Sequence, residues 1–468
     1  MATPEPEPQQ RTLDDASAEV VSADDVDFDV ETDVLVAGGG GCGLTATLAA
    51  CENDDLTVTL LEKSDEVGGN AALSTGMIPA GGTRLQREAG IEETPEDMAR
   101  DIMEKNGYEA DEEMVQHLCE NSAELVHWLV DDWDISLHIV DDFKYPKHSE
   151  YRMHAPPGRN GENLVAEMRE RIESEDNTEL LTNTPVKKLV AKDGAVCGVV
   201  AGAIREEAIR AEKVILATDG FAGNKEMVRE FCEEDIADAL YYGSDGNTGD
   251  GIRWGAELGG DLASMDAYQG HATVVDGTGV LSTYAVVMNG GILVNADGER
   301  FGNESKGYSE FALDVVRQDG GVAYEIFDER IFEKLEGEFE DFDRAIELGS
   351  YDHADSVDAL AETLGCDPDA TAAAVEAYNE AVEAGEPDEV GRLDGRDTLS
   401  APFYGTTVTG SLFHTQGGLV VDGHGRVCRE DDSLVGDLYA GGGCATGISG
   451  HGADGYLSGN GLTTAMGL

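Results

Sequence analysis

The sequence predicts an α/β fold in which one large domain is interrupted by an insert. Residues 31–63 have the pattern of a strand, a glycine-rich turn, a helix and a second strand, which together make one βαβ unit. Residues 178–218 alternate in strand fashion, turn at Asp193-Gly194 and end in the buried strand "VILAT". Strand signals return at "GGLVVDGHGRV" and "DLYAGGG" after residue 416, so the end of the chain rejoins the first domain.

The turn of the βαβ unit carries a dinucleotide-binding pattern. Gly38, Gly40 and Gly43 form G-x-G-x-x-G, which allows a tight turn, close approach of a pyrophosphate and close helix–strand packing. Phosphates then lie at the helix N-terminus, where free N–H groups and the helix dipole favour anions. Glu62 ends the second strand, where its carboxylate can accept hydrogen bonds from a ribose diol. A glycine-rich turn in an unrelated α/β sheet is the competing interpretation.

Helical periodicity covers several later segments, and most of them open with a capping residue. We expect helices over residues 94–107, 110–133 and 158–174, and another that starts at Thr248. Between about residues 266 and 413 a few short strands precede charged helices such as "DPDATAAAVEAYNEAVEAG". The insert is therefore expected to be mostly helical.

The charge of the chain is far from that of ordinary globular proteins. Its 468 residues include 96 Asp and Glu against 31 Lys and Arg, a formal net charge of −65. The acidic residues are spread along the whole chain, which predicts a protein adapted to very high salt, where ions screen the self-repulsion. An acidic docking surface for a basic partner is the alternative. Such a surface argues against nucleic acid or an anionic membrane as a partner.

The compartment is predicted from segments that the sequence lacks. Residues 1–28 have neither a basic region nor an apolar core, so we expect a disordered acidic segment and not a signal peptide. No apolar run reaches the roughly 18 residues of a membrane-spanning helix. The cysteines form no C-x-x-C pair and have no metal-ligand spacing, which favours reduced thiols in a cytoplasmic protein without a metal site. They are Cys42, Cys51, Cys119, Cys197, Cys232, Cys366, Cys428 and Cys444.

Six stretches, taken in order, resemble one known family. They are "VLVAGGGGCGLTATLAA", "LLEKSDEVGGNAALSTGM", "VILATDGFAGNKEMV", "NTGDGIRWGAELGG", "GILVNADGERFGNES" and "DLYAGGGCATGISG…YLSGNGL". The match spans residues 33–468 and is similar to the flavoprotein superfamily of fumarate reductases and 3-ketosteroid dehydrogenases. The resemblance implies a Rossmann-like FAD-binding domain of the glutathione-reductase type (29–265 and 414–468). It also implies an inserted α+β capping domain (266–413) that contacts substrate.

The resemblance also assigns the residues that hold the cofactor. The pyrophosphate would be lined by Gly38, Gly40, Cys42 and Gly43, the ribose by Glu62, and the flavin and its phosphates by Asn70, Ala71, Thr75 and Gly76. Val186 would meet the adenine, and Asp250, Gly443, Asn460, Gly461 and Leu462 the rest of FAD. Free N–H groups of the last three would stabilise negative charge on the reduced ring. "GGNAALSTGM" contains no histidine for covalent attachment, so we expect noncovalent FAD. Asp219 replaces a glycine that is usual in the family, which leaves the backbone conformation there open.

The substrate residues distinguish two branches of this superfamily. Fumarate reductases clamp carboxylates and donate a proton through arginines. At those two positions this chain has Tyr308, after "RFGNE", and Tyr456, in "GYLSG"; only His414 coincides with a fumarate reductase substrate residue. The 3-ketosteroid dehydrogenases carry both tyrosine motifs, so they are the closer match.

Tyrosine suits the removal of a proton beside a ketone. That step needs a base with a polar tip in an apolar pocket and donors for the enolate oxygen. We assign Tyr456 as the proton abstractor, with Ser458 hydrogen-bonding to it, and Tyr308 as the group that polarises the carbonyl or shares the proton. The two tyrosine roles could be exchanged. The alternative is that both rings only pack, Tyr456 over the flavin edge and Tyr308 in the core of the insert.

The predicted function is an FAD-dependent oxidoreductase that introduces or reduces a carbon–carbon double bond next to a carbonyl. The resemblance implies a small-molecule substrate, an apolar ketone similar to a 3-ketosteroid. A reductase of an unsaturated carboxylate such as fumarate or urocanate is the first alternative. A flavoprotein electron-transfer subunit, whose partner supplies the chemistry, is the second. The physiological direction and the electron acceptor stay open.

Overall fold

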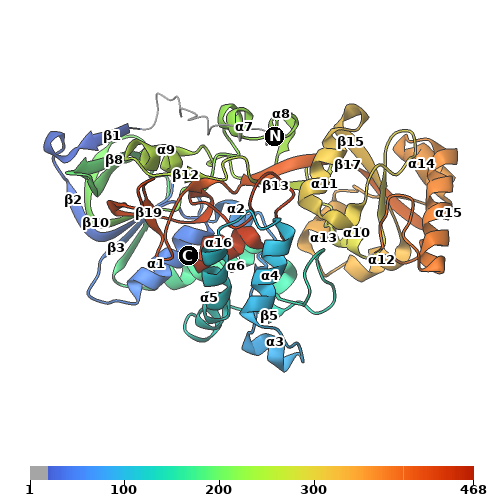
Figure 1. Cartoon of the computed structure of the whole chain (residues 1–468), viewed down its shortest axis with the longest axis horizontal. Helices are drawn as coiled ribbons and strands as arrows, with labels where there is room; N and C mark the ends of the chain where they lie inside the picture. Colours follow the sequence, from blue (N-terminus) through green and yellow to red (C-terminus); the bar gives the residue numbers. More distant parts are fainter. Residues whose placement is uncertain (1–18, 394) are drawn as a thin grey trace, which may run out of the picture.

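The first lobe of the protein is built on a large sheet in which parallel pairs predominate (Figure 1). In a computed structural model, residues 19–393 and 395–468 are described. The nine-stranded sheet has the order β1-β8-β9-β20-β10-β2-β3-β7, with β19 paired to β20. The strands are β1 (Glu19–Ser22), β2 (Val30–Ala37), β3 (Val58–Leu61), β7 (Thr178–Leu181), β8 (Val186–Lys192), β9 (Ala195–Ala201), β10 (Glu207–Leu216), β19 (Arg426–Cys428) and β20 (Leu434–Ala440).

The predicted βαβ unit lies at the centre of this sheet. Strand β2 pairs in parallel with β3, and helix α1 (Gly41–Cys51) connects them. Strand β10 pairs in parallel with β2 on one side and β20 on the other, so the interrupted domain is closed by the end of the chain. Apolar residues such as Leu35 and Val36 point to opposite faces and are both fully buried, as a sheet covered on both sides requires. The final helix α16 (Asn460–Gly467) packs against α1.

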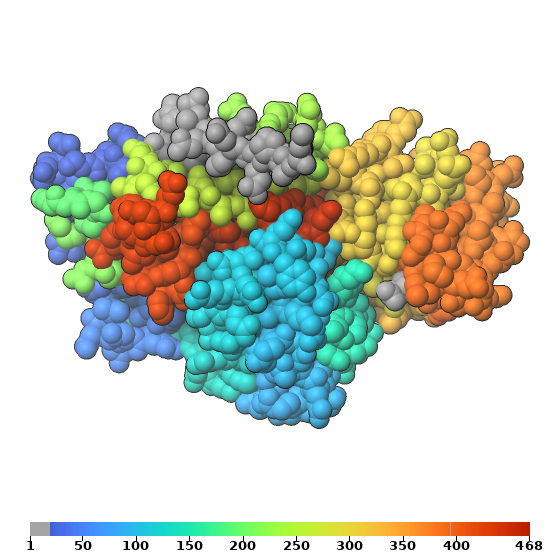
Figure 2. Space-filling view, in the orientation of Figure 1, coloured from blue at the N-terminus to red at the C-terminus, as the bar shows by residue number. Residues whose placement is uncertain are grey.

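The helices expected in the first half of the chain are confirmed. They are α4 (Pro95–Lys105), α5 (Glu112–Asp131), α6 (Gly161–Glu173) and α9 (Asp250–Glu257). Thr94 caps α4 in a capping box with Asp97, and Asp111 and Asn160 cap α5 and α6 through their side chains. In Figure 2 the residues of α4 and α5 lie in front of the C-terminal segment, of which only part is visible.

The second lobe contains a six-stranded sheet and is less helical than we expected. Strand β17 (Phe403–Thr415) spans 13 residues and pairs with β11, β13, β15 and β16. The other strands are β11 (Leu240–Tyr241), β13 (Tyr268–Val275), β14 (Ile292–Val294), β15 (Val322–Asp328) and β16 (Asp352–Ala354). The helices are α10 (Ala285–Met288), α11 (Tyr308–Val316), α12 (Glu329–Leu335), α13 (Glu340–Glu347), α14 (Val357–Leu364) and α15 (Pro368–Ala384). The expected mostly helical insert is therefore wrong for β13, β15 and β17, whose β-branched and aromatic residues favour strands.

The remaining elements are shorter. They are α2 (Gly69–Ala72), β4 (Ile78–Pro79), α3 (Arg84–Glu88), β5 (His138–Ile139), β6 (Met153–Ala155), α7 (Lys225–Phe231), α8 (Glu234–Asp238), β12 (Leu262–Ala263) and β18 (Gly418–Leu419). Strands β4, β5 and β6 form a small sheet below the large one.

The N-terminal segment departs from the expected disorder at residues 19–28. Strand β1 pairs in parallel with β8, and Glu19 forms an ion pair with Lys188 at 2.6 Å. The open edge of β8 offers unpaired backbone groups, and β1 satisfies them. Residues 1–18 lie outside the described residues.

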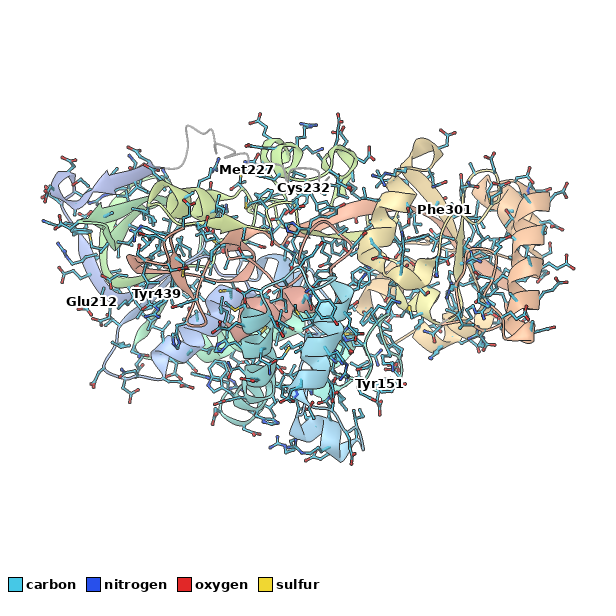
Figure 3. The ribbon with its side chains drawn as sticks, in the orientation of Figure 1. Tyr151, Glu212, Met227, Cys232, Phe301 and Tyr439 are labelled. Atoms are coloured by element: carbon cyan, nitrogen blue, oxygen red, sulfur yellow. The ribbon has the colours of Figure 1, made fainter. Side chains whose placement is uncertain are left out.

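The surface of the protein is rich in acidic side chains. Oxygen-tipped side chains surround both lobes in Figure 3, with Glu212 at the outer edge of the large sheet. No helix within residues 19–393 and 395–468 is long and apolar enough to cross a membrane. The eight cysteines are all free thiols, half of them buried.

Candidate active site

The glycine-rich turn has the geometry that a phosphate cradle requires. Gly38 has φ +108°, and a Cβ there would lie 2.2 Å from the Ala217 carbonyl oxygen. A Cβ on Gly43 would lie 1.8 Å from the Gly38 carbonyl oxygen, so helix and strand pack too closely for any side chain. At Gly40 a Cβ would meet only the Gly68 carbonyl oxygen at 3.9 Å, so this Cα faces open space at the start of α1. The turn therefore fits a cofactor phosphate on the helix N-terminus.

The end of β3 is fixed by the carboxylate of Glu62. Its Oε2 accepts a hydrogen bond from the Gly39 amide at 2.7 Å, and its Oε1 accepts one from the Ser64 amide at 2.7 Å. Asp250, the first residue of α9, forms ion pairs with Lys63 at 3.4 Å and with Arg253 at 2.8 Å. Val186 begins β8 and is partly buried. These three predicted cofactor residues lie outside the wall of the main cavity.

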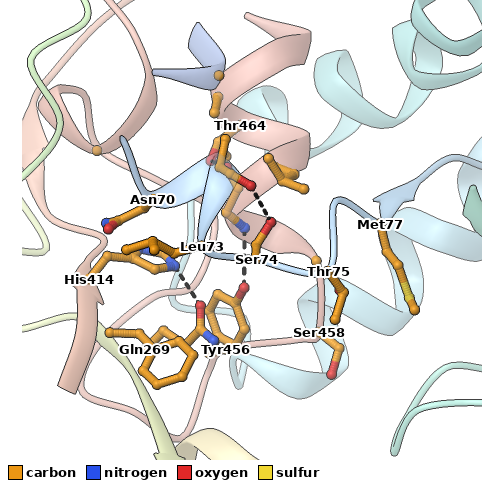
Figure 4. A pocket seen from close by; sticks show the side chains of 18 of the residues that line it. Asn70, Leu73, Ser74, Thr75, Met77, Gln269, His414, Tyr456, Ser458 and Thr464 are labelled. Carbon is orange, nitrogen blue, oxygen red and sulfur yellow. Dashed lines mark hydrogen bonds between the residues drawn. The ribbon is translucent and has the colours of Figure 1, made fainter. Parts of the chain in front are cut away.

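The main cavity lies between the N-termini of α1 and α16 and the second sheet (Figure 4). It has a volume of about 1330 Å³, including its open mouth. Predicted residues in its wall are Gly40, Cys42, Asn70, Ala71, Thr75, Tyr308, His414, Gly443, Tyr456, Ser458, Gly461 and Leu462. Gly38, Gly43, Gly76 and Asn460 are not in the wall. Asn460 supports it from behind, because its Nδ2 donates to the Ser449 hydroxyl at 3.2 Å.

Asp219, which stands where a glycine is usual in the family, has a left-handed backbone conformation. Its φ is +62°, in the left-handed region that Asp tolerates better than most residues. Its Oδ2 accepts a hydrogen bond from Asn70 Nδ2 at 2.9 Å, and its Oδ1 accepts one from the Gly220 amide at 2.8 Å. The carboxylate lies in the wall of the main cavity.

Tyr308 and Tyr456 meet in one apolar cluster at the inner end of the cavity. Tyr308 is the first residue of α11, whereas Tyr456 lies in the loop before α16. Their ring centroids are 6.1 Å apart. Burial raises the pKa of Tyr308 to about 12, an effect that the Ser458 and Tyr456 hydroxyls oppose. The structure thus brings the Ser458 hydroxyl to Tyr308.

The Tyr456 hydroxyl is also held in its neutral form. Burial raises its pKa well above the ordinary value, and the nearby Tyr308 raises it further. The Gly461 amide donates to the Tyr456 hydroxyl at 3.4 Å and opposes that shift. The start of α16 therefore faces this hydroxyl with a backbone donor.

Four rings in the cavity wall form a continuous stack that ends at Tyr308. Tyr242 stacks on Phe413 at 4.8 Å, Phe413 on His271 at 5.0 Å, and His271 on Tyr308 at 4.7 Å between centroids. Burial lowers the pKa of His271 to about 3, so this ring is neutral. His271 was not predicted from the sequence. The alternation in "YQGHATVV", which places Gln269 and His271 on one face of a strand, is the signal that could have found it.

His414 is held by amide groups on both ring nitrogens. Its Nε2 lies 2.5 Å from Gln269 Oε1, and Gln416 Nε2 lies 3.0 Å from its Nδ1. Gln269 Oε1 can only accept, so Nε2 carries a proton, whereas Nδ1 faces both the Gln416 amide and, at 3.4 Å, the Thr415 carbonyl oxygen. Burial lowers the pKa of His414, although the charge of Asp219 raises it in part. Gln269 and Gln416 were not predicted from sequence.

The cavity wall, as far as the structure describes it, contains neither lysine nor arginine. Buried arginines elsewhere are already paired. Arg152 contacts Glu93 and Asp101 at 2.5 Å each, and Arg300 contacts Glu304 at 2.6 Å. The described wall therefore combines aromatic, aliphatic and neutral polar groups with the carboxylate of Asp219, and it offers no Lys or Arg to a substrate carboxylate.

A model of the family described as "FAD binding domain" matches residues 33–462. This chain belongs to that family. The FAD binding domain protein is 31% identical over 436 residues to "Fumarate reductase (cytochrome)" of Shewanella frigidimarina. This match covers 92% of this chain and 74% of the relative. The predicted family and the prediction of an FAD-dependent oxidoreductase are confirmed.

Two solved structures are similar to this FAD binding domain protein over most of its length. One is the open conformation of a flavocytochrome c3 fumarate reductase, with TM-score 0.78, 28% identity, and 94% of this chain and 77% of that chain covered. The other is the 3-ketosteroid-Δ4-(5α)-dehydrogenase from Rhodococcus jostii RHA1 in complex with 4-androstene-3,17-dione, with TM-score 0.74, 27% identity, and coverage of 96% and 98%. The α/β fold with its large, mainly parallel sheet is thus that of FAD-binding oxidoreductases.

Proposed function

We propose that this FAD-dependent oxidoreductase introduces or reduces a carbon–carbon double bond beside the carbonyl of an apolar ketone. One observation carries the proposal: paired tyrosines, together with further aromatic rings, line a cavity whose described wall has no lysine or arginine. An apolar ketone needs apolar walls and a hydroxyl donor for its oxygen, whereas a carboxylate needs a cation.

The two tyrosines divide the proton chemistry. Bound FAD supplies the two-electron acceptor or donor for the bond that changes. One phenol removes or returns the proton beside the carbonyl, and the other donates a hydrogen bond to the oxygen as it gains negative charge. The Ser458 hydroxyl, which opposes the rise in the pKa of Tyr308, favours Tyr308 as the base, while the Gly461 N–H donor favours Tyr456.

The outer part of the cavity also favours a substrate without carboxylates. An adjoining cavity shares Leu73, Ser74 and Tyr242 with the main one and lies toward α13. Arg344 and Arg159 there are paired with Glu347 at 3.0 Å and Asp142 at 2.8 Å. Its acidic lining residues are Glu162, Glu340, Asp341, Asp343 and Glu347. An approaching anion would be repelled by this lining.

A reductase of an unsaturated carboxylate is the second candidate, because a fumarate reductase is among the relatives and His414 lies in the wall. A neutral His414 with amides on both nitrogens is a poor partner for a carboxylate. An electron-transfer flavoprotein subunit is a further candidate, and it would reduce dyes without turning over any organic substrate.

The deciding experiment is the loss of visible flavin absorbance under nitrogen, with panels of apolar ketones and of carboxylic acids. We expect bleaching by saturated ketones, and reoxidation of chemically reduced protein by the matching enones. Reoxidation by fumarate or urocanate, with no response to any ketone, would replace this proposal with the carboxylate function.

We further propose noncovalent FAD and adaptation to high salt in the cytoplasm. Residues 68–77 contain no histidine for attachment, and the formal charge is −65. Acid should therefore release yellow FAD into the supernatant; colour that stays with precipitated protein would contradict this.

The melting temperature should rise from dilute to molar KCl as repulsion is screened. A melting temperature indifferent to KCl would favour the acidic docking surface.

A further inference from the structure

The segment between β5 and β6 contacts the loop that carries Ser458. His148 in this segment is 6% exposed, and its Nε2 lies 3.1 Å from the Ser458 carbonyl oxygen. A carbonyl oxygen only accepts, so Nε2 carries a proton and donates the hydrogen bond. Burial, and then the charge of Arg152, holds the pKa of His148 well below its ordinary value, so the ring is neutral. The backbone of a cavity residue is thus fixed by a histidine that is not in the cavity wall.

His148 is held in place by the residues on either side of it. Ser149 donates to Asp101 Oδ2 from its amide and from its hydroxyl, at 2.7 Å each, which anchors this part of the segment to α4. Lys147 has φ +67°, a left-handed conformation that is uncommon for a residue other than glycine. Backbone strain of this kind persists only where the surrounding structure holds it, and it concentrates at functional sites. The backbone is therefore strained immediately before the residue that contacts Ser458.

The loop of Ser458 also has little freedom on its other side. Gly459 precedes α16 with φ +88°, and a Cβ there would lie 2.6 Å from Pro79 Cγ of β4. Ser458 itself lies in the cavity wall (Figure 4), and its hydroxyl opposes the rise in the pKa of Tyr308. A shift of the Ser458 backbone would move this hydroxyl relative to Tyr308.

We propose that His148 is a positioning residue that acts through Ser458. Its hydrogen bond to the Ser458 carbonyl oxygen aligns the Ser458 hydroxyl with Tyr308 for proton transfer. The inference rests on the proposed proton chemistry of the two tyrosines. A hydroxyl that is already aligned needs no reorganisation during the reaction, so its alignment lowers the barrier of the chemical step. Loss of the His148 donor should therefore slow this step and leave the binding of FAD and substrate nearly unchanged.

A double-mutant cycle tests whether His148 acts through Ser458. His148→Leu removes the donor, whereas His148→Gln keeps an amide N–H at the end of a side chain of similar volume. Each variant is made alone and together with Ser458→Ala, and His154→Leu is the matched control. His154 is a fully buried histidine of β6 whose ring nitrogens face the Thr83 hydroxyl and the Ile78 carbonyl oxygen. Stopped-flow flavin reduction gives the limiting rate and the substrate dissociation constant separately, while FAD content and urea unfolding report on the fold.

We expect His148→Leu to lower the limiting rate of flavin reduction about fivefold to tenfold, the order expected for one hydrogen bond. The affinities for FAD and substrate should stay within about twofold of those of the natural protein. His148→Gln should recover most of the rate, and in the Ser458→Ala background His148→Leu should change it by less than about twofold. An equal loss in both backgrounds, or in His154→Leu, would overturn the proposal. So would loss of FAD or of the folded state in His148→Leu, because His148 would then support the fold as a whole.

Failure of this proposal is distinct from failure of the proposed function. The natural protein alone decides the function, by its response to ketones and to unsaturated carboxylates. The cycle is then measured with whichever class reacts, so a carboxylate substrate would replace the ketone and still show whether His148 and Ser458 are coupled. A natural protein that reacts with neither class would overturn both proposals.

Discussion

The ring centroids of Tyr308 and Tyr456 lie 6.1 Å apart, although one residue begins α11 in the second lobe and the other precedes the last helix of the first. Each ring is at least nine-tenths buried. Two buried phenols this close can share one proton, because each hydroxyl can donate to the other or to the substrate oxygen. The chemistry of the cavity therefore depends on how the two lobes meet.

Removing either hydroxyl should abolish most activity while FAD stays bound. Tyr456→Phe should lower substrate-driven flavin reduction by about 10²–10⁴, the range for a lost general base. Tyr308→Phe should lower it by about 10²–10³, the cost of a lost oxyanion donor. Ser458→Ala should cost less, since its hydroxyl adjusts the pKa of Tyr308. Stopped-flow reduction with ketone measures these rates. Tyr404→Phe, outside the cavity wall, is the control; normal rates in both tyrosine variants would exclude a proton role.

The pH profile identifies which tyrosine is the base. With a pKa of about 12, Tyr308 is protonated at neutral pH. As the pH rises toward that value, its phenolate fraction increases about tenfold with each pH unit. If Tyr308 is the base, kcat/KM should rise about tenfold per unit between about pH 8 and 10. Tyr456→Phe should then keep this slope and Tyr308→Phe should lose it. The reverse pattern would assign the base to Tyr456, and a flat profile in the natural protein would argue against a phenol base.

The glycine-rich turn could be predicted from sequence because it is local. Gly38, Gly40, Gly43 and Glu62 lie within one βαβ unit, and their spacing alone dictates the turn and the packing. The capping residues of α4 and α5 likewise act on their own helices.

The residues near the substrate could not be predicted in the same way. Gln269, His271 and Gln416 acquire their positions only when β13 pairs with β17, and no local pattern dictates that pairing. The same long-range pairing made the second lobe a sheet where helices were expected. Tyr308 and Tyr456 were found through a family motif, because no local pattern of the sequence brings the two rings together.

Glu62 should control the affinity for FAD. It accepts hydrogen bonds from the amides of Gly39 and Ser64, so removing it also loosens the phosphate turn. Glu62→Ala should weaken FAD binding by about 1.5–3 kcal/mol, the value of hydrogen bonds to a charged acceptor. Dialysis followed by FAD fluorescence measures the loss. Glu66→Ala, an exposed residue of the following loop, is the control. Unchanged FAD affinity in Glu62→Ala would remove Glu62 from the cofactor site.

A buried carboxyl in the second sheet should make stability depend on pH. Glu325 on β15 is fully buried, and its Oε2 accepts from the Ser282 hydroxyl at 2.6 Å. Burial raises its pKa from 4.5 to about 8, so the folded state holds a proton that the unfolded chain loses above about pH 4.5. Its contribution to stability is therefore present at low pH and is lost as pH rises toward 8.

Glu325→Gln keeps the acceptor for Ser282 but does not titrate. Its free energy of unfolding in urea, at fixed KCl, should fall less between about pH 5 and 8 than that of the natural protein. Glu376→Gln, exposed on α15, should follow the natural protein. Parallel curves for Glu325→Gln and the natural protein would show that this carboxyl is ionised in the folded state.

His414 distinguishes the ketone function from the carboxylate function. Its nitrogens are occupied by Gln269 and Gln416, and burial lowers its pKa, so it stays neutral near pH 7 and attracts no anion. His414→Asn should therefore change kcat/KM for a ketone by less than about tenfold, whereas an enzyme that needs this group to hold a carboxylate should lose about 10²–10³. Steady-state rates with both substrate classes measure the difference. An inactive His414→Asn, together with near-normal turnover in Tyr456→Phe, would restore the reduction of an unsaturated carboxylate as the function of this cavity.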